Sequence, residues 1–204
     1  ALSSIVMQSV CNTFGPTTIA AFTSAMRIEQ VATQPMASFG IAMATYTAQN
    51  YGAGYIGRIK RGVFNCSMIS LGISVVMGIL MYTVGENMVG IFIKDHNEAV
   101  ISQAQAYLNI SVLFYFFLGQ IFIYRNALQG FGKPIIPLIS SVAELLMRSF
   151  AAIVLAAHIG YIGVCIASPI AWVGGGIVVS IGYYYTLRQI SKQYCAQKPT
   201  LCKN

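Results

Sequence analysis

Three long stretches of this chain contain no Lys, Arg, Asp or Glu: residues 63–84, 104–124 and 149–187. Charged residues make up 8% of the 204 residues and hydrophobic residues 56%, whereas about a quarter of a soluble domain is charged. A helix of about 20 apolar residues crosses the ~30 Å hydrocarbon core of a bilayer. The sequence therefore predicts an all-α integral membrane protein in which most residues face lipid or other helices.

Glycine, proline and polar clusters divide the chain into six predicted membrane helices. They cover residues 1–14, 17–50, 62–84, 104–129, 135–157 and 162–187. The first is too short to span alone, so we expect a truncated helix that begins upstream of Ala1. Together they predict one six-helix transmembrane bundle over residues 1–187, followed by a polar tail over residues 188–204.

Two local features refine this prediction. Pro35 lies inside the second helix, where a proline removes a backbone donor and clashes with the preceding turn, so a kink is expected there. The polar connection after the third helix contains a short apolar segment, Met88 to Ile93. We expect this segment to lie at the membrane interface.

Basic residues concentrate in alternate connections. The connection between the second and third helices holds Arg58, Lys60 and Arg61, the one between the fourth and fifth holds Lys133, and the tail holds Arg188, Lys192, Lys198 and Lys203. With six crossings these three segments fall on one side of the membrane, which the positive-inside rule makes cytoplasmic. We expect a multi-pass protein of the cytoplasmic (inner) membrane with a cytoplasmic C-terminus. The net charge of +7 then needs no nucleic-acid partner.

The fifth predicted helix carries Glu144 and Arg148, and charged groups at bilayer depth are costly unless they find a partner. They are four residues apart, so they lie on one helix face and can pair. One interpretation is a neutralised pair that orients the helix. The other is a carboxylate that lines a cavity and responds to protons or cations.

The second predicted helix carries Arg27, Gln30 and Gln34 on one face, with Glu29 pointing elsewhere. This half of the helix either lies at a wet interface or lines a polar cavity beside Pro35. Asn12, in the first helix, is a further polar side chain that can bond across helices. We therefore take Glu144, Arg148, Gln34 and Asn12 as candidates for the wall of a transport cavity.

Motifs of soluble enzymes are missing from the sequence. It contains no G-x-x-x-x-G-K-[ST] loop, no H-E-x-x-H and no G-x-S-x-G. Neither His96 nor His158 has the spacing of a metal site. We expect no enzymatic activity, no metal site and no cofactor.

Several segments follow one another in a recognisable order. The second helix and the connection after it contain Ile19-Ala20-Ala21-Phe22, Arg27-Ile28, Pro35, Gln49-Asn50-Tyr51-Gly52-Ala53-Gly54 and Arg58-Ile59-Lys60, and the fourth helix ends in Arg125-Asn126-Ala127-Leu128-Gln129-Gly130-Phe131-Gly132-Lys133-Pro134. In this order and spacing they resemble the second half of multidrug and toxic compound extrusion (MATE) transporters. The resemblance extends over nearly the whole chain.

The resemblance implies half of a transporter with two six-helix lobes around a central cavity. This chain is similar to the C-terminal lobe, so the N-terminal lobe of the same chain would be its partner, alongside a small organic substrate and the lipid bilayer. The implied activity is export of organic, often cationic, drugs or toxic compounds in exchange for sodium ions or protons. An acid that some members carry in the fourth helix has no counterpart here, because residues 104–129 contain no Asp or Glu. The coupling ion is left open.

Two alternatives remain. A lipid-linked saccharide flippase of related architecture should have a strongly cationic cavity, for which only Arg27 and Arg148 are candidates here. A non-transporting membrane scaffold subunit is the other.

Overall fold

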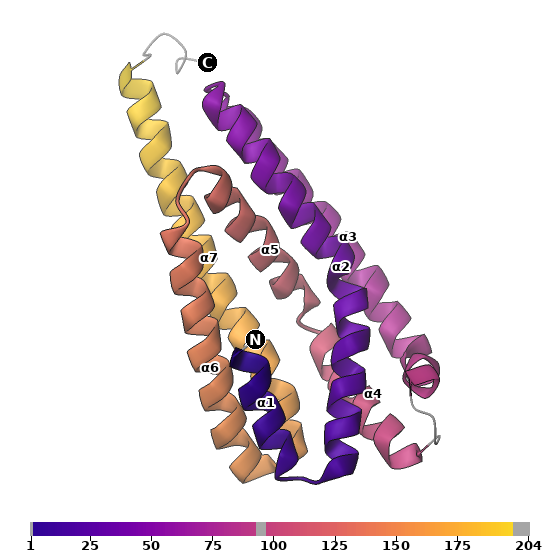
Figure 1. Ribbon diagram of the computed structural model, residues 1–204. Coiled ribbons are helices and arrows are strands. Elements are labelled where there is room, and N and C mark those ends of the chain that lie inside the picture. Colours follow the sequence, from indigo (N-terminus) through magenta and orange to yellow (C-terminus); the bar gives the residue numbers. More distant parts are fainter. Residues whose placement is uncertain (1, 93–96, 198–204) are drawn as a thin grey trace.

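The computed structural model describes residues 2–92 and 97–197, and this part of the chain is entirely helical (Figure 1). Its helices are α1 (Leu2–Asn12), α2 (Pro16–Gly52), α3 (Ile56–Phe92), α4 (Glu98–Val112), α5 (Tyr115–Gly130), α6 (Ile135–Ile159) and α7 (Tyr161–Gln197). With α4 and α5 counted as one interrupted helix, they correspond to the six predicted helices. The prediction of an all-α transmembrane bundle is confirmed.

Three helices, α3, α6 and α7, are each long and apolar enough to cross a membrane, and α4 with α5 passes the same criterion as one broken span. Many large apolar side chains of these helices are exposed, among them Val76, Leu146 and Phe150. Side chains of this kind on the outside of a bundle are suited to lipid rather than to water. The molecule is a multi-pass membrane protein.

Two predicted helix starts and two predicted helix ends are wrong. The third helix begins at Ile56 rather than near residue 62, and the fourth begins at Glu98 rather than near residue 104. The sequence predicts that the third helix ends at Val84, but α3 continues to Phe92. The segment expected to lie separately at the interface is therefore largely the end of α3, with Ile93 outside the described residues. The last helix is predicted to end at Leu187, but α7 continues to Gln197. Lys and Gln are good helix formers, so polar residues extend a helix past the apolar span.

The fourth predicted helix is interrupted. A turn at Leu113 and Phe114 separates α4 from α5, and the two helices are bent by 57°. No proline or glycine lies at this turn, so the sequence contains no conventional signal for it. The two halves share neighbours: both α4 and α5 pack on α2, α3 and α7, and α5 also contacts α6. Pro35 lies inside α2, whose ribbon changes direction near its middle (Figure 1).

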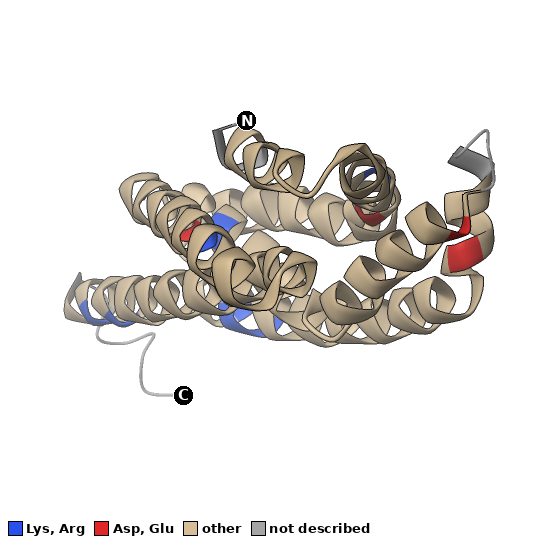
Figure 2. Cartoon of the chain, turned by 90° about the horizontal axis from the view of Figure 1, so that it is seen from below, with Lys and Arg blue, Asp and Glu red and all other residues tan. Residues whose placement is uncertain are grey.

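The connections alternate between the two ends of the bundle. In Figure 1 the α2–α3 and α5–α6 connections and the end of α7 lie at the top, and the α1–α2 and α6–α7 connections lie at the bottom. The described basic residues of this group therefore share one end, named here the basic end: Lys133, Arg188 and Lys192, together with Arg58, Lys60 and Arg61, which lie in the first turns of α3. Lys198 and Lys203 lie outside the described residues. Figure 2 shows long uncharged helix surfaces, with acidic residues near the far end of α3 and the start of α4. The structure thus gathers the basic connections as the sequence predicts.

Small residues let the helix backbones approach closely. A Cβ atom on Gly40 would lie 2.9 Å from the carbonyl oxygen of Phe122, where α2 meets α5. A Cβ atom on Gly163 would lie against the backbone of Leu155, where α7 meets α6. Membrane helices associate through such small-residue contacts because burial away from lipid supplies no hydrophobic driving force. These contacts hold α2, α5, α6 and α7 around the interior site described next.

Candidate functional site

The interior of the lobe contains one buried carboxylate, Glu29 of α2. Its residue is 8% exposed, the lowest exposure of any carboxylate residue among those described. The hydroxyl of Tyr107 on α4 donates a hydrogen bond to Glu29 Oε2 at 3.0 Å. Tyr107 is itself 1% exposed and packs its ring edge-on against Phe22. A charged group held this deeply requires a partner or a bound ion.

Groups from three other helices lie around this carboxylate. Arg148 of α6 acts electrostatically on both Glu29 and Tyr107. Ser111 of α4 lies close to the carboxylate, and Tyr115 of α5 is near enough to be affected by its charge. Residues far apart in the sequence therefore build one polar cluster around a buried carboxylate.

Three oxygen atoms in this cluster lack a hydrogen bond of good geometry, although Ser111 lies near enough to Glu29 to interact with it. They are Glu29 Oε1, Ser111 Oγ and Tyr115 Oη, and all three are buried. An unpaired buried polar atom costs about 1–3 kcal/mol, so a cluster of them needs an explanation. Carboxylate and hydroxyl oxygens are the donors that a hard cation prefers. The donor set fits a small alkali-metal ion or a proton on the carboxylate.

The depth of the cluster follows from helix geometry. At about 1.5 Å per residue, Glu29 lies roughly 20 Å from Pro16 at the start of α2, and Tyr107 roughly 14 Å from Glu98 at the start of α4. Arg148 lies about 16 Å from Ile159 at the end of α6. All three distances run from the end of the bundle opposite to the basic end. These distances are comparable with half of a hydrocarbon core, which is about 15 Å thick.

Glu29 is the residue that sequence reasoning missed. The prediction placed Arg27, Gln30 and Gln34 on one face and set Glu29 aside as pointing elsewhere. The structure exposes those three side chains and buries Glu29. A signal was present, because Glu29 lies four residues after buried Ala25 and seven before buried Met36, the spacing of one helix face. It belongs to the apolar face of α2, where a carboxylate is least expected.

The predicted pairing of Glu144 with Arg148 is wrong. Glu144 instead forms a salt bridge with Arg125 of α5, and its helix neighbour Arg148 acts on Glu29. Ser140 donates a hydrogen bond to the carbonyl oxygen of Gly175 at 3.1 Å and lies 3.4 Å from Glu144 Oε1. Helix spacing shows which residues share a face, but α5 brings a second arginine to that face from another part of the chain.

The remaining predicted residues lie at the surface of this lobe. Gln34 is exposed on α2, and Asn12 is exposed at the last position of α1. Of the four predicted residues, Arg148 alone interacts electrostatically with the Glu29 cluster in the contacts described. Whether Gln34, Asn12, Glu144 and Arg148 contact a substrate stays a prediction. In the described part of the chain, no three His, Cys, Asp or Glu side chains are grouped to hold a metal.

Comparison with known proteins identifies the family. The MatE family profile matches residues 1–154 of this chain, which is more than half of its length. The chain therefore belongs to the MatE family. A comparison with curated protein sequences finds no match.

Solved structures show the same fold. A multidrug resistance MATE family transporter of the MOP superfamily, in its outward-facing conformation, matches with a TM-score of 0.86 at 19% identity, over 93% of this chain and 43% of its own. The Vibrio cholerae MATE transporter VcmN in its bent form matches with a TM-score of 0.87 at 19% identity, over 95% of this chain and 44% of the transporter.

A Pyrococcus furiosus MOP superfamily transporter, described as having a binding pocket of reversed polarity that suggests a different function, matches with a TM-score of 0.81 at 18% identity. The match covers 93% of this chain and 42% of that transporter. The chain thus spans less than half the length of the transporters that it resembles. Its fold is that of part of such a transporter.

Proposed function

We propose that this chain is one lobe of a secondary antiporter that exports organic, cationic compounds in exchange for sodium ions or protons. A second lobe, absent from this sequence, would complete a central cavity, and rocking of the two lobes would give alternating access. The basic end would face the cytoplasm, so the C-terminus would lie on the cytoplasmic side of the inner membrane. The family and the fold support a transporter, and the choice of ion and substrate class is the proposal.

The observation that carries this proposal is the Glu29 cluster. A buried carboxylate with one oxygen unpaired is a binding site for a cation that crosses the membrane. Tyr107 and Arg148 hold it from two other helices, so binding at Glu29 changes interactions across α2, α4 and α6. We propose that this is the coupling-ion site of the lobe.

The test is transport by the complete protein in sealed vesicles. Uptake of a fluorescent organic cation is measured under an imposed sodium gradient in one arm and an imposed pH gradient in the other. The gradient that drives uphill movement identifies the ion. Glu29→Gln removes the charge with little change in shape, and transport should fall roughly tenfold or more, within the usual range of a coupling free energy.

Glu86→Gln serves as the matched control, because Glu86 is an exposed carboxylate of α3 and should leave transport unchanged. Purified yield and helix content should match for both variants. Equal transport by Glu29→Gln and the natural protein would overturn the ion site. Absence of uphill transport under either gradient would overturn the antiporter, and movement of a lipid-linked saccharide in the same vesicles would favour a flippase.

A further inference from the structure

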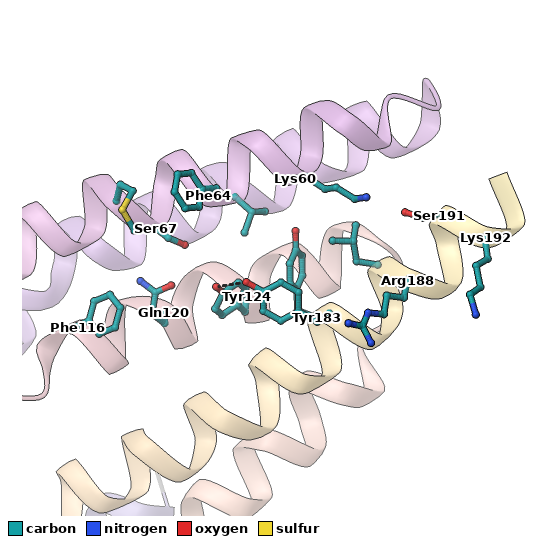
Figure 3. Close-up of a pocket in the computed structure, with 14 residues that line it drawn as sticks. Lys60, Phe64, Ser67, Phe116, Gln120, Tyr124, Tyr183, Arg188, Ser191 and Lys192 are labelled. Atoms are coloured by element: carbon teal, nitrogen blue, oxygen red, sulfur yellow. Dashed lines mark hydrogen bonds between the residues drawn. The ribbon is translucent and has the colours of Figure 1, made fainter. Parts of the chain in front are cut away.

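A second polar feature lies away from the Glu29 cluster, at the basic end. A groove of about 910 Å³ runs between α3, α5 and α7. Figure 3 shows Lys60 on the α3 side and Arg188 and Lys192 on the α7 side, with Gln120 and Tyr124 of α5 between them. The floor is therefore aromatic and polar, and the rim is cationic.

The charge of this groove has one sign. Three of its lining residues, Lys60, Arg188 and Lys192, are cations, and none is acidic. Two tyrosine hydroxyls lie among them, with Tyr124 Oη and Tyr184 Oη 3.4 Å apart. Lysine, arginine and tyrosine hydroxyls donate hydrogen bonds to phosphate oxygens. The open end of the groove is complementary to an anionic headgroup.

The groove continues into the membrane region as an apolar trough. A second groove of about 680 Å³ between α3, α4 and α5 shares Phe116 with the first. Along α3, Lys60 is followed at helical spacing by Phe64, Met68, Leu71 and Val75, all exposed in this lobe and all lining one groove or the other. This stripe places a charge at one end and apolar side chains along the rest.

The length of the stripe matches one leaflet. From Lys60 to Leu71, where the second groove begins, α3 rises about 16 Å. Half of a hydrocarbon core is about 15 Å. A ligand whose charge lies at Lys60 thus has its apolar part alongside Phe64, Met68 and Phe116. A free phosphate would leave this trough uncovered, and an ordinary neutral lipid would leave the cations unpaired.

We propose that the groove between α3, α5 and α7 is a binding site for an anionic phospholipid. Its phosphate contacts Lys60, the exposed side chains of Arg188 and Lys192 add positive charge on the α7 side of the rim, and one acyl chain lies along α3 past Phe116. The site lies outside the Glu29 cluster and does not depend on the proposed ion coupling. Bound lipid would bridge α3 and α7, so it would stabilise one separation of these helices.

The test counts lipids bound to the complete protein. Protein reconstituted in discs of neutral lipid, with or without phosphatidylglycerol, is analysed by native mass spectrometry. The variant Lys60→Ala/Arg188→Ala/Lys192→Ala should bind phosphatidylglycerol at least tenfold more weakly, because each cation near an anionic lipid contributes roughly fivefold. The matched control, Arg58→Ala/Arg61→Ala/Lys133→Ala, removes the same charge at the same end from residues outside the groove.

Two further arms identify the source of the anion. Leu71→Trp obstructs the trough and should weaken phosphatidylglycerol binding while leaving the cations in place. Soluble glycerol phosphate, added at the same concentration to the natural protein, should not displace the lipid. Equal loss in both triple variants, or retention of phosphatidylglycerol by both, would overturn the site.

The occupant is checked independently by cross-linking. A photoreactive group at Phe64 should label phospholipid. If it labels another part of the transporter or a second copy instead, the groove is a protein interface and the proposal is wrong.

Discussion

Glu29 and Glu144 are both carboxylates within membrane helices, yet the structure gives them different surroundings. Glu144 forms a direct salt bridge with Arg125, and Ser140 beside it bonds the backbone of α7. Glu29 Oε2 accepts one hydrogen bond from the Tyr107 hydroxyl, and Oε1 has no hydrogen bond of good geometry. A carboxylate with a direct cationic partner orients helices, whereas one with an unpaired oxygen has capacity for an ion. Residue type and depth alone do not separate these roles.

Removing the partner of Glu144 should have the largest effect on stability. Arg125→Ala leaves a carboxylate that is 14% exposed without its cation, which costs about 3 kcal/mol. The double variant Arg125→Met/Glu144→Met removes both charges and should recover most of that loss. Unfolding of purified protein in mild detergent measures the difference. If the double variant is as unstable as the single one, the loss reflects packing of the arginine stem rather than an unpaired charge.

The hydroxyl that holds Glu29 should affect ion binding more than folding. Tyr107→Phe removes one hydrogen bond to a charged group, about 1.5 kcal/mol, and should weaken the apparent affinity for the coupling ion about tenfold. The readout is the ion concentration that gives half-maximal transport. Tyr183→Phe is the control, because Tyr183 is buried and its hydroxyl has no hydrogen-bond partner. Equal shifts in both variants would contradict a specific role for Tyr107.

Two neighbouring glycines of α7 give the smallest and most local test. A Cβ atom on Gly175 would lie within 2.3 Å of Glu144 Cγ, whereas one on Gly176 would meet its nearest neighbour, Ile121, at 3.7 Å. Gly175→Ala should destabilise the lobe by about 1 kcal/mol. Gly176→Ala should be neutral or slightly stabilising, because alanine favours a helix. Thermal unfolding of the two variants in parallel decides whether Glu144 is as tightly enclosed as the structure indicates.

The sequence predicted the helices better than their contacts. Uncharged stretches and glycine or proline breaks located the helices, because transfer of a helix into lipid depends on its own composition. The interruption at Leu113 and Phe114 was not predictable in this way, because neither residue is a conventional helix breaker.

The candidate site shows the same limit. Helix spacing placed Glu144 and Arg148 on one face, but it did not reveal that Arg125 would form the salt bridge with Glu144. Glu29 was set aside because it does not share the helix face of Arg27, Gln30 and Gln34. The buried positions on either side of it, at Ala25 and Met36, carried the signal.

Composition and charge by themselves determined that this chain is a membrane helical bundle with its basic connections at one end, because hydrophobic transfer and charge placement are properties of each segment alone. The tertiary structure decided which charges meet. It brought Tyr107 and Arg148 to Glu29 and Arg125 to Glu144, since the cost of an unpaired charge in a core of low dielectric is relieved by whichever group packing places nearest.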